Sequence, residues 1–244
     1  MCGGCAPFIL VPMKKHIRIL LVGVVALLAT VTACSSGTKE APQSPAQTSA
    51  APTTAEPFPQ SAKYIADTKS ADGKSMVIGI AVDGAKVAAY ACNGVDDEAW
   101  FFGDQKDGKI SLTSRFKDTL AADFNGKDVV GDLTMNGVAF KFSVPAVPPP
   151  AGMYTAQFQG VRASWVVRPD GSATGVQFNG GVSGRDFEQA ELQQLNEQQF
   201  RNSVRNKRQL QQAQQITLLA NKSARSTING HEVTPVIVDG DFRL

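Results

Sequence analysis

The chain has 244 residues, of which 43% are hydrophobic and 19% charged, and these values fit a globular protein of one or two domains. Its 24 Lys and Arg residues nearly balance 22 Asp and Glu residues, and the net charge of +2 argues against a nucleic-acid partner. The only histidines are His16 and His231, too few for a histidine-rich metal site. We therefore expect no nucleic acid, no metal and no cofactor.

The N-terminal 33 residues have the layout of a signal peptide. Lys14, Lys15 and Arg18 precede an uncharged apolar run at residues 19–33. A membrane-spanning helix needs about 20 apolar residues, so this run favours a cleaved signal peptide over an uncleaved anchor, which is the alternative. Because Met13 directly precedes the basic residues, we interpret it as the true start and residues 1–12 as an upstream extension.

The end of this leader reads Val31-Thr32-Ala33-Cys34 and resembles the lipobox of bacterial lipoproteins, except that Val31 stands where Leu is commonest. The resemblance implies a diacylglyceryl thioether on Cys34, cleavage between Ala33 and Cys34, and acylation of the new N-terminus, for example with palmitate. It further implies that the protein is anchored by lipid at the extracytoplasmic face of the cell membrane. An ordinary secretory cleavage that leaves an incidental cysteine is the alternative reading.

Residues 34–62 are rich in Ser, Thr, Pro, Ala and Gln and contain Phe58 as their one large apolar residue. Such a composition buries too little apolar surface to offset chain entropy, so it predicts a disordered tether between the lipid and the folded protein. Removal of the leader takes away three cations and leaves the mature chain with a net charge of −1.

Residues 63–183 are predicted to form a β domain. Asp-Gly or Asn-Gly dipeptides tolerate the positive φ that tight hairpin turns require. They occur at residues 72–73, 83–84, 93–94, 107–108, 125–126, 136–137, 170–171 and 179–180. Short runs with strand composition lie among them, at residues 75–82, 86–92, 99–103, 109–114, 120–124, 129–135, 138–144, 153–158, 161–168 and 173–178.

Hydrophobic alternation predicts that these strands have one buried face. Val138, Phe140, Phe142 and Val144 alternate with polar residues such as Lys141. The fold class is therefore mainly β, an antiparallel meander that closes into a small barrel or folds as a sandwich. We expect at least seven antiparallel strands and no helix longer than about two turns before Phe178.

Residues 184–222 are rich in Gln and predict a long polar C-terminal helix that begins near Asp186, with Gln189 completing a capping box. Its apolar residues are sparse, so we expect it to dock weakly. We interpret its basic turn as a solvated face, with an anionic lipid or wall polymer as the alternative partner. That turn consists of Arg201, Arg205, Lys207 and Arg208. Residues 223–244 form a tail in which Asn229-Gly230 indicates a last hairpin.

Catalytic candidates are few. His231 has no Gly-x-Ser-x-Gly partner, and Cys92 ends an apolar strand, where a buried, inert thiol is the usual state. The acidic run at residues 96–98 lacks the spacing of a calcium loop. We read Trp100, together with Phe101 and Phe102, as core and rim aromatics. We predict no catalytic residue and no enzyme activity, and the ligand-binding residues stay unknown.

The sequence favours a non-enzymatic, lipid-anchored envelope protein whose β domain binds or scaffolds an envelope protein or an apolar ligand. In layout it resembles the small secreted lipoproteins of actinobacteria, a resemblance that transfers no site residues. One alternative is a carrier of a lipid or other apolar ligand inside a β-barrel, in a cavity lined by residues such as Phe140, Phe142 and Trp165. A cell-wall hydrolase that uses His231 is less favoured.

Overall fold

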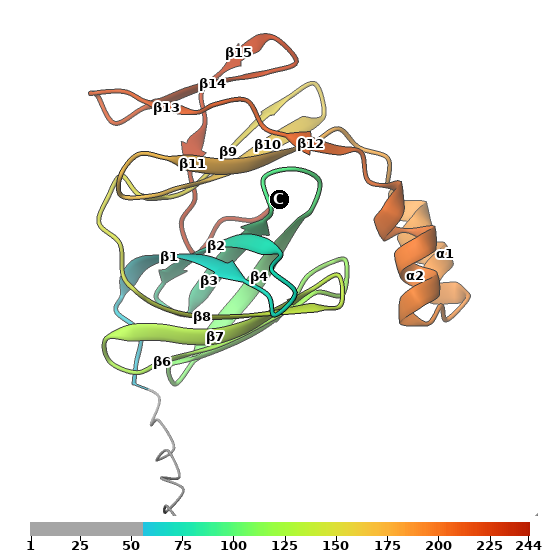
Figure 1. Ribbon diagram of the computed structural model, residues 1–244, viewed down its shortest axis with the longest axis horizontal. Helices are drawn as coiled ribbons and strands as arrows, with labels where there is room; N and C mark the ends of the chain where they lie inside the picture. The colour runs from blue at the N-terminus through green and yellow to red at the C-terminus, as the bar shows by residue number, and fades with distance from the viewer. Residues whose placement is uncertain (1–55) are drawn as a thin grey trace, which may run out of the picture. The chain divides into compact units, whose positions relative to one another are not determined.

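The computed structural model describes residues 56–244, which fold mainly as antiparallel β-sheet (Figure 1). This confirms the mainly β prediction. The signal peptide, the lipidation site at Ala33-Cys34 and most of the predicted tether lie outside the described residues. In the described part of the chain, no helix is long and apolar enough to cross a bilayer.

The first eight strands form one meandering, barrel-like sheet in which each strand pairs with its neighbour in sequence. The two end strands approach each other, with a single bridge between Tyr64 and Ala146 and a 2.8 Å hydrogen bond from Val147 N to Lys63 O. The barrel is therefore nearly closed. Its strands are β1 (Ser61–Lys69), β2 (Ser75–Asp83), β3 (Lys86–Cys92), β4 (Glu98–Lys106), β5 (Lys109–Thr113), β6 (Thr119–Phe124), β7 (Asp128–Met135) and β8 (Val138–Pro145).

Two smaller sheets are stacked on one side of the barrel (Figure 1). The nearer sheet has five strands in the order β12-β11-β10-β9-β16, and the farther one has three in the order β13-β14-β15. Their bounds are β9 (Gly152–Phe158), β10 (Val161–Val167), β11 (Ala173–Phe178), β12 (Leu210–Gln212), β13 (Thr217–Leu218), β14 (Ala224–Ile228), β15 (His231–Val233) and β16 (Val236–Ile237).

The burial of each barrel strand follows from what covers it. β5 alternates buried and exposed residues, because its outer face meets water. In β2, by contrast, every residue from Met76 to Val82 is buried, since the second sheet packs on its outer face. Gly79 allows this close approach: a Cβ there would lie 2.4 Å from Cγ of Met153 in β9.

The turns follow the predicted dipeptides closely. Asp107-Gly108 joins β4 to β5 and Asn136-Gly137 joins β7 to β8, with positive φ at both residues of each pair. The Gln159-Gly160 turn between β9 and β10 has the same geometry without either dipeptide. Asn179-Gly180 is the exception, because it leads out of β11 into the helical segment instead of a hairpin.

The prediction of one long C-terminal helix is wrong. The segment contains α1 (Gly184–Leu192), α2 (Glu197–Ser203) and a 3₁₀ turn η1 (Arg205–Lys207). Ser183 is the N-cap of α1, and Asp186 is the third residue of that helix. Asn196 is the N-cap of α2, so a second capping motif divides the segment into two helices. Beyond η1, the Gln-rich residues form β12, because the edge of β11 offers backbone partners that outweigh their helix propensity.

The folded region also begins earlier than the composition suggested. β1 starts at Ser61, inside the segment assigned to the tether. Phe58, which is 8% exposed, stacks on Phe124 with ring centroids 5.1 Å apart, and Glu56 N donates to Phe124 O at 2.7 Å. The last residues before β1 therefore belong to the barrel core.

Candidate functional site

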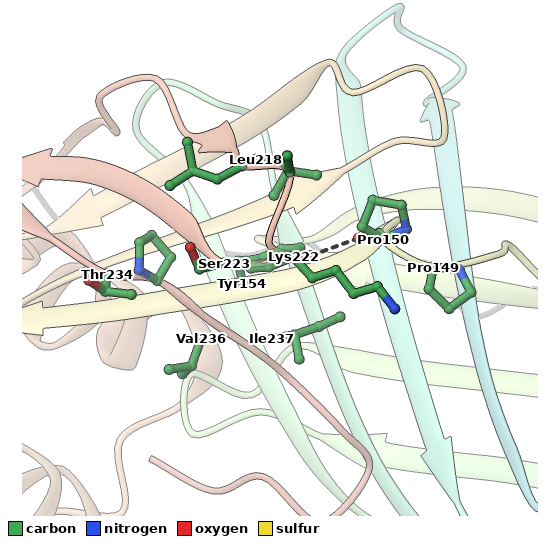
Figure 2. A pocket seen from close by; sticks show the side chains of 12 residues that line it. Pro149, Pro150, Tyr154, Leu218, Lys222, Ser223, Thr234, Val236 and Ile237 are labelled. Atoms are coloured by element: carbon green, nitrogen blue, oxygen red, sulfur yellow. Dashed lines mark hydrogen bonds between the residues drawn. The ribbon is translucent and has the colours of Figure 1, made fainter.

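An apolar pocket of about 770 Å³ lies at one edge of the second sheet, beside the third sheet (Figure 2). Its base is Tyr154 of β9, next to the edge strand β16, which pairs with β9 through Val236 and Ile237. The other walls come from the Pro149-Pro150 connection between β8 and β9 and from the β13–β14 turn. We call this hollow the edge pocket, and its volume is in the range of small-molecule sites.

The lining of the edge pocket is mainly apolar and partly open to solvent. Val236 is 56% exposed and Ile237 is 39% exposed, although both belong to a strand. The Tyr154 hydroxyl donates to the Pro150 carbonyl at 2.8 Å, the dashed line in Figure 2, and holds the connection in place. Burial raises the pKa of Tyr154, so the phenol remains the donor.

Lys222 is the one charged residue among the described residues that line the edge pocket. It occupies a positive-φ position in the β13–β14 turn, and its side chain extends toward Pro149 and Pro150 (Figure 2). The described lining contains no His, Cys, Asp or Glu, and therefore no general base of those types. The arrangement suits an apolar ligand that carries an acidic end group.

The barrel interior is not the cavity expected for a carrier. Phe140 and Phe142 belong to the packed core inside the barrel, together with Phe101 and Leu133. Trp165 lies instead between the second and third sheets, where its Nε1–H donates to Gln214 O at 2.8 Å. These three aromatics therefore do not line one cavity.

Two residues of the basic turn, Arg205 and Arg208, have buried side chains and do not belong to a solvated face, whereas Lys207 is exposed. The Arg205 side chain is 3% exposed, and its Nη1 donates to both carboxylate oxygens of Asp118 at 2.6 and 2.7 Å. Asp97 accepts from Arg205 and also from Arg208, whose side chain is 5% exposed. The barrel carries the matching carboxylates, so this turn docks the helical segment onto it.

Two residues of the acidic run are used in such contacts, Asp97 with the helical segment and Glu98 with the second sheet. Asp97 is shared by the two arginines, and Glu98 accepts hydrogen bonds from Arg162 and from the Tyr90 hydroxyl. Within residues 56–244, no group of three His, Cys, Asp or Glu side chains is placed to hold a metal ion.

The two remaining candidates for reactive side chains, Cys92 and His231, lie in different environments. Cys92 is fully buried, and desolvation raises the pKa of its thiol to about 12. His231 is exposed in β15 and stacks on Phe158 with centroids 4.5 Å apart. Among the described residues, the His231 side chain forms no hydrogen bond or ion pair, and its contact is this ring stacking.

The sequence analysis did not identify the edge pocket, because the segments that form its walls were assigned to other features. Pro149 and Pro150 lie between the predicted strands at residues 138–144 and 153–158, residues 218–222 fell at the end of the predicted helix, and residues 234–237 fell in the tail. Comparison of the chain with models of protein families, with curated proteins and with solved structures finds no match.

Proposed function

We propose that this chain is a lipid-anchored protein of the extracytoplasmic face of the cell membrane whose β-rich unit binds an apolar ligand without catalysing a reaction. The edge pocket carries this proposal. It combines a volume of about 770 Å³ with an apolar lining and a single lysine, a composition that recognises an acyl chain ending in a carboxylate.

Three features support binding over catalysis at this site. The described lining contains no His, Cys, Asp or Glu that could act as a general base. The apolar surface at Val236 and Ile237 stays exposed in a strand, where a soluble surface would ordinarily carry polar residues. Lys222 forms no ion pair with any described residue, so its ammonium group is free for a ligand.

The anchoring part of the proposal depends on the lipobox resemblance at Cys34. A lipid-anchored binding protein stays close to a bilayer, the source of acyl-chain ligands. Together the two parts describe a protein that holds an amphiphile at the membrane surface.

The pocket is tested with cis-parinaric acid, a fluorescent fatty acid, added to the chain from residue 34 onward with Cys34→Ala. We expect saturable fluorescence enhancement that Val236→Glu weakens by about tenfold or more, since a buried carboxylate in an apolar site is costly and repels the probe. Val95→Glu is the matched control: Val95 is 59% exposed, against 56% for Val236, and it does not line the pocket. Equal binding by both variants would refute the edge pocket as the site.

Lys222 is tested separately, because its substitution removes charge without changing the apolar walls. Lys222→Ala should weaken binding of the fatty acid but leave binding of the corresponding fatty alcohol unchanged. A charge-assisted hydrogen bond is worth about 1.5–3 kcal/mol, so the expected loss is roughly ten- to hundredfold. If acid and alcohol lose affinity equally, Lys222 acts through packing and not through its charge.

A further inference from the structure

A second pocket, of about 460 Å³, lies between the outer face of the barrel, the second sheet and helix α1. It shares no lining residue with the edge pocket. We call it the arginine–aromatic pocket, and its lining includes Trp100, Phe102, Arg115, Phe116, Arg162 and Phe187.

Flat side chains form much of its wall. Trp100 and Phe102 are stacked, with centroids 5.6 Å apart and an interplanar angle of 14°. The Arg115 guanidinium carbon lies 3.9 Å from the centroid of the Phe187 ring, and Phe187 in turn packs against Phe116. Aromatic faces and guanidinium planes both favour a flat ligand that stacks on them.

The side chains of this lining include two guanidinium groups, those of Arg115 and Arg162, and one carboxylate, that of Glu98. Glu98 is satisfied by Arg162 and by the hydroxyl of Tyr90, which donates to it at 2.9 Å. Arg115 is exposed and, within residues 56–244, forms neither an ion pair nor a side-chain hydrogen bond. One guanidinium with its planar fork of donors therefore remains available to an anion.

Two buried donors in the same lining also lack acceptors. Trp100, which is 7% exposed, has an Nε1–H without a partner, and Arg162 has an Nε–H without one. Buried N–H groups are nearly always hydrogen-bonded, and an unsatisfied one destabilises the folded state. Both N–H groups are shielded from the space of the pocket, so they leave its wall incompletely satisfied but do not themselves contact a ligand.

We propose that the arginine–aromatic pocket binds a small planar carboxylate of the aryl-acid type. Its ring packs among the aromatic walls and its carboxylate is recognised by Arg115. This ligand class differs from the acyl chain assigned to the edge pocket, and the inference does not depend on that assignment.

The test uses 4-nitrobenzoate, a planar acid that quenches tryptophan fluorescence, with the chain from residue 34 onward. Calorimetric titration measures the affinity of the unaltered sequence. Fluorescence of the Trp165→Phe variant locates the site, because Trp100 is then the only tryptophan left of two. We expect saturable quenching of Trp100 and no saturable binding of the neutral analogue 4-nitrobenzyl alcohol.

Arg115→Ala should raise the dissociation constant of 4-nitrobenzoate about tenfold or more, and Arg115→Lys should give an intermediate value, because it keeps the charge but loses the planar fork. The matched control is Arg185→Ala, which removes an exposed arginine of α1 that does not line the pocket. Arg115 is exposed, so its variants should keep the fold, which circular dichroism verifies.

Three outcomes would overturn the proposal: no saturable binding of 4-nitrobenzoate, equal affinity for the alcohol, or an unchanged affinity in Arg115→Ala. Tighter binding of decanoate than of 4-nitrobenzoate, lost in Arg115→Ala, would also overturn it by making the ligand a fatty acid. The Val236→Glu variant should bind 4-nitrobenzoate normally, so failure of the edge pocket and failure of this pocket are distinguished.

Discussion

At the scale of single residues, the position of Glu98 between the barrel and the second sheet changes the pKa of its carboxyl group. Glu98 is 3% exposed and accepts hydrogen bonds from Arg162 and from Tyr90. Burial raises the pKa of Glu98, and the guanidinium of Arg162, which lowers it, offsets only part of that effect. The folded state therefore holds this proton more tightly than the unfolded chain does.

This difference predicts a pH dependence of stability. Unfolded Glu has a pKa of about 4.3, so between that value and the raised folded pKa the native state binds more protons than the unfolded state. The contribution of Glu98 is then fully present below about pH 4.3 and is lost as the pH rises through its folded pKa.

Glu98→Gln removes this titration. The difference in unfolding free energy between the natural chain and the variant should therefore shift in favour of the natural chain as the pH falls from about 7 toward 4.3. Urea denaturation at several pH values measures it, and comparison with the variant cancels the other carboxylates. A shift in the opposite direction would mean that Arg162, not burial, dominates the Glu98 pKa.

Cys92 provides a second test at the scale of one residue. Its side chain is fully buried and its pKa is raised to about 12, so the native thiol is both inaccessible and protonated at pH 8. In the chain from residue 34 with Cys34→Ala, where Cys92 is the only cysteine, Ellman's reagent should react only after urea unfolds the protein. Rapid reaction under native conditions would place Cys92 in a segment that opens readily.

At the scale of elements, the helical segment is an insertion between two paired strands, β11 and β12. Asn179 N donates to Gln209 O at 2.8 Å and Gln209 N donates to Gly180 O at 2.9 Å, so the chain leaves and returns at one point. Phe200, Val204 and Arg205 are buried. Weak docking, expected from the sparse apolar residues, stays a prediction, but the buried ion pairs of Arg205 with Asp97 and Asp118 supply contacts that hydrophobic spacing does not reveal.

Arg205 is the residue on which this docking depends most. Arg205→Met leaves Asp118 buried without its bidentate partner, and breaking such a pair typically costs about 3–5 kcal/mol of unfolding free energy. Arg201→Met is the control, because its pair with Glu197 is 27% and 74% exposed and should contribute less than about 1 kcal/mol. Urea denaturation measures both variants.

The double variant Arg205→Met with Asp118→Leu separates the cost of an unpaired charge from the loss of packing. It should recover much of the stability lost in Arg205→Met, because two apolar side chains leave no buried charge without a partner. If the double variant is less stable than Arg205→Met, the ion pair itself stabilises the docked segment.

The elements that sequence reasoning identified were those with local signals. Turn dipeptides with positive φ and alternating strands such as β8 depend on neighbouring residues, and they located most barrel strands. β1 was missed because its Ser, Ala and Lys residues continue the tether composition, and β12 because its Gln residues favour a helix when isolated. β12 forms by pairing with β11 across the intervening helical segment, which no local pattern encodes, whereas β1 pairs with its sequence neighbour β2.

At the scale of the whole folded unit, the spaces suited to ligands lie at the borders between sheets and helices. The barrel interior is filled by large side chains such as Phe101, Phe140 and Leu133. Both candidate pockets instead combine segments from different layers, including the β8–β9 connection and the helical segment. Because each pocket needs the complete tertiary arrangement, the sequence could predict the fold class but not the sites.

We expect attachment of the protein to the membrane to depend on Cys34. Lipidation requires the Cys34 thiol, so Cys34→Ala should remove the lipid-modified form and shift the protein from the detergent phase to the aqueous phase in Triton X-114 partitioning, or should leave the precursor unprocessed. Cys92→Ala is the matched control, since it makes the same substitution at a cysteine buried in the fold, and it should partition like the natural chain.

Mass spectrometry of the detergent-phase protein should locate a diacylglyceryl group on an N-terminal Cys34. The mass of the mature protein should be the same when translation starts at Met13, because both starts lead to the same mature chain. A Cys34→Ala protein that is processed and still partitions fully into detergent would show that something other than Cys34 holds this protein at the membrane.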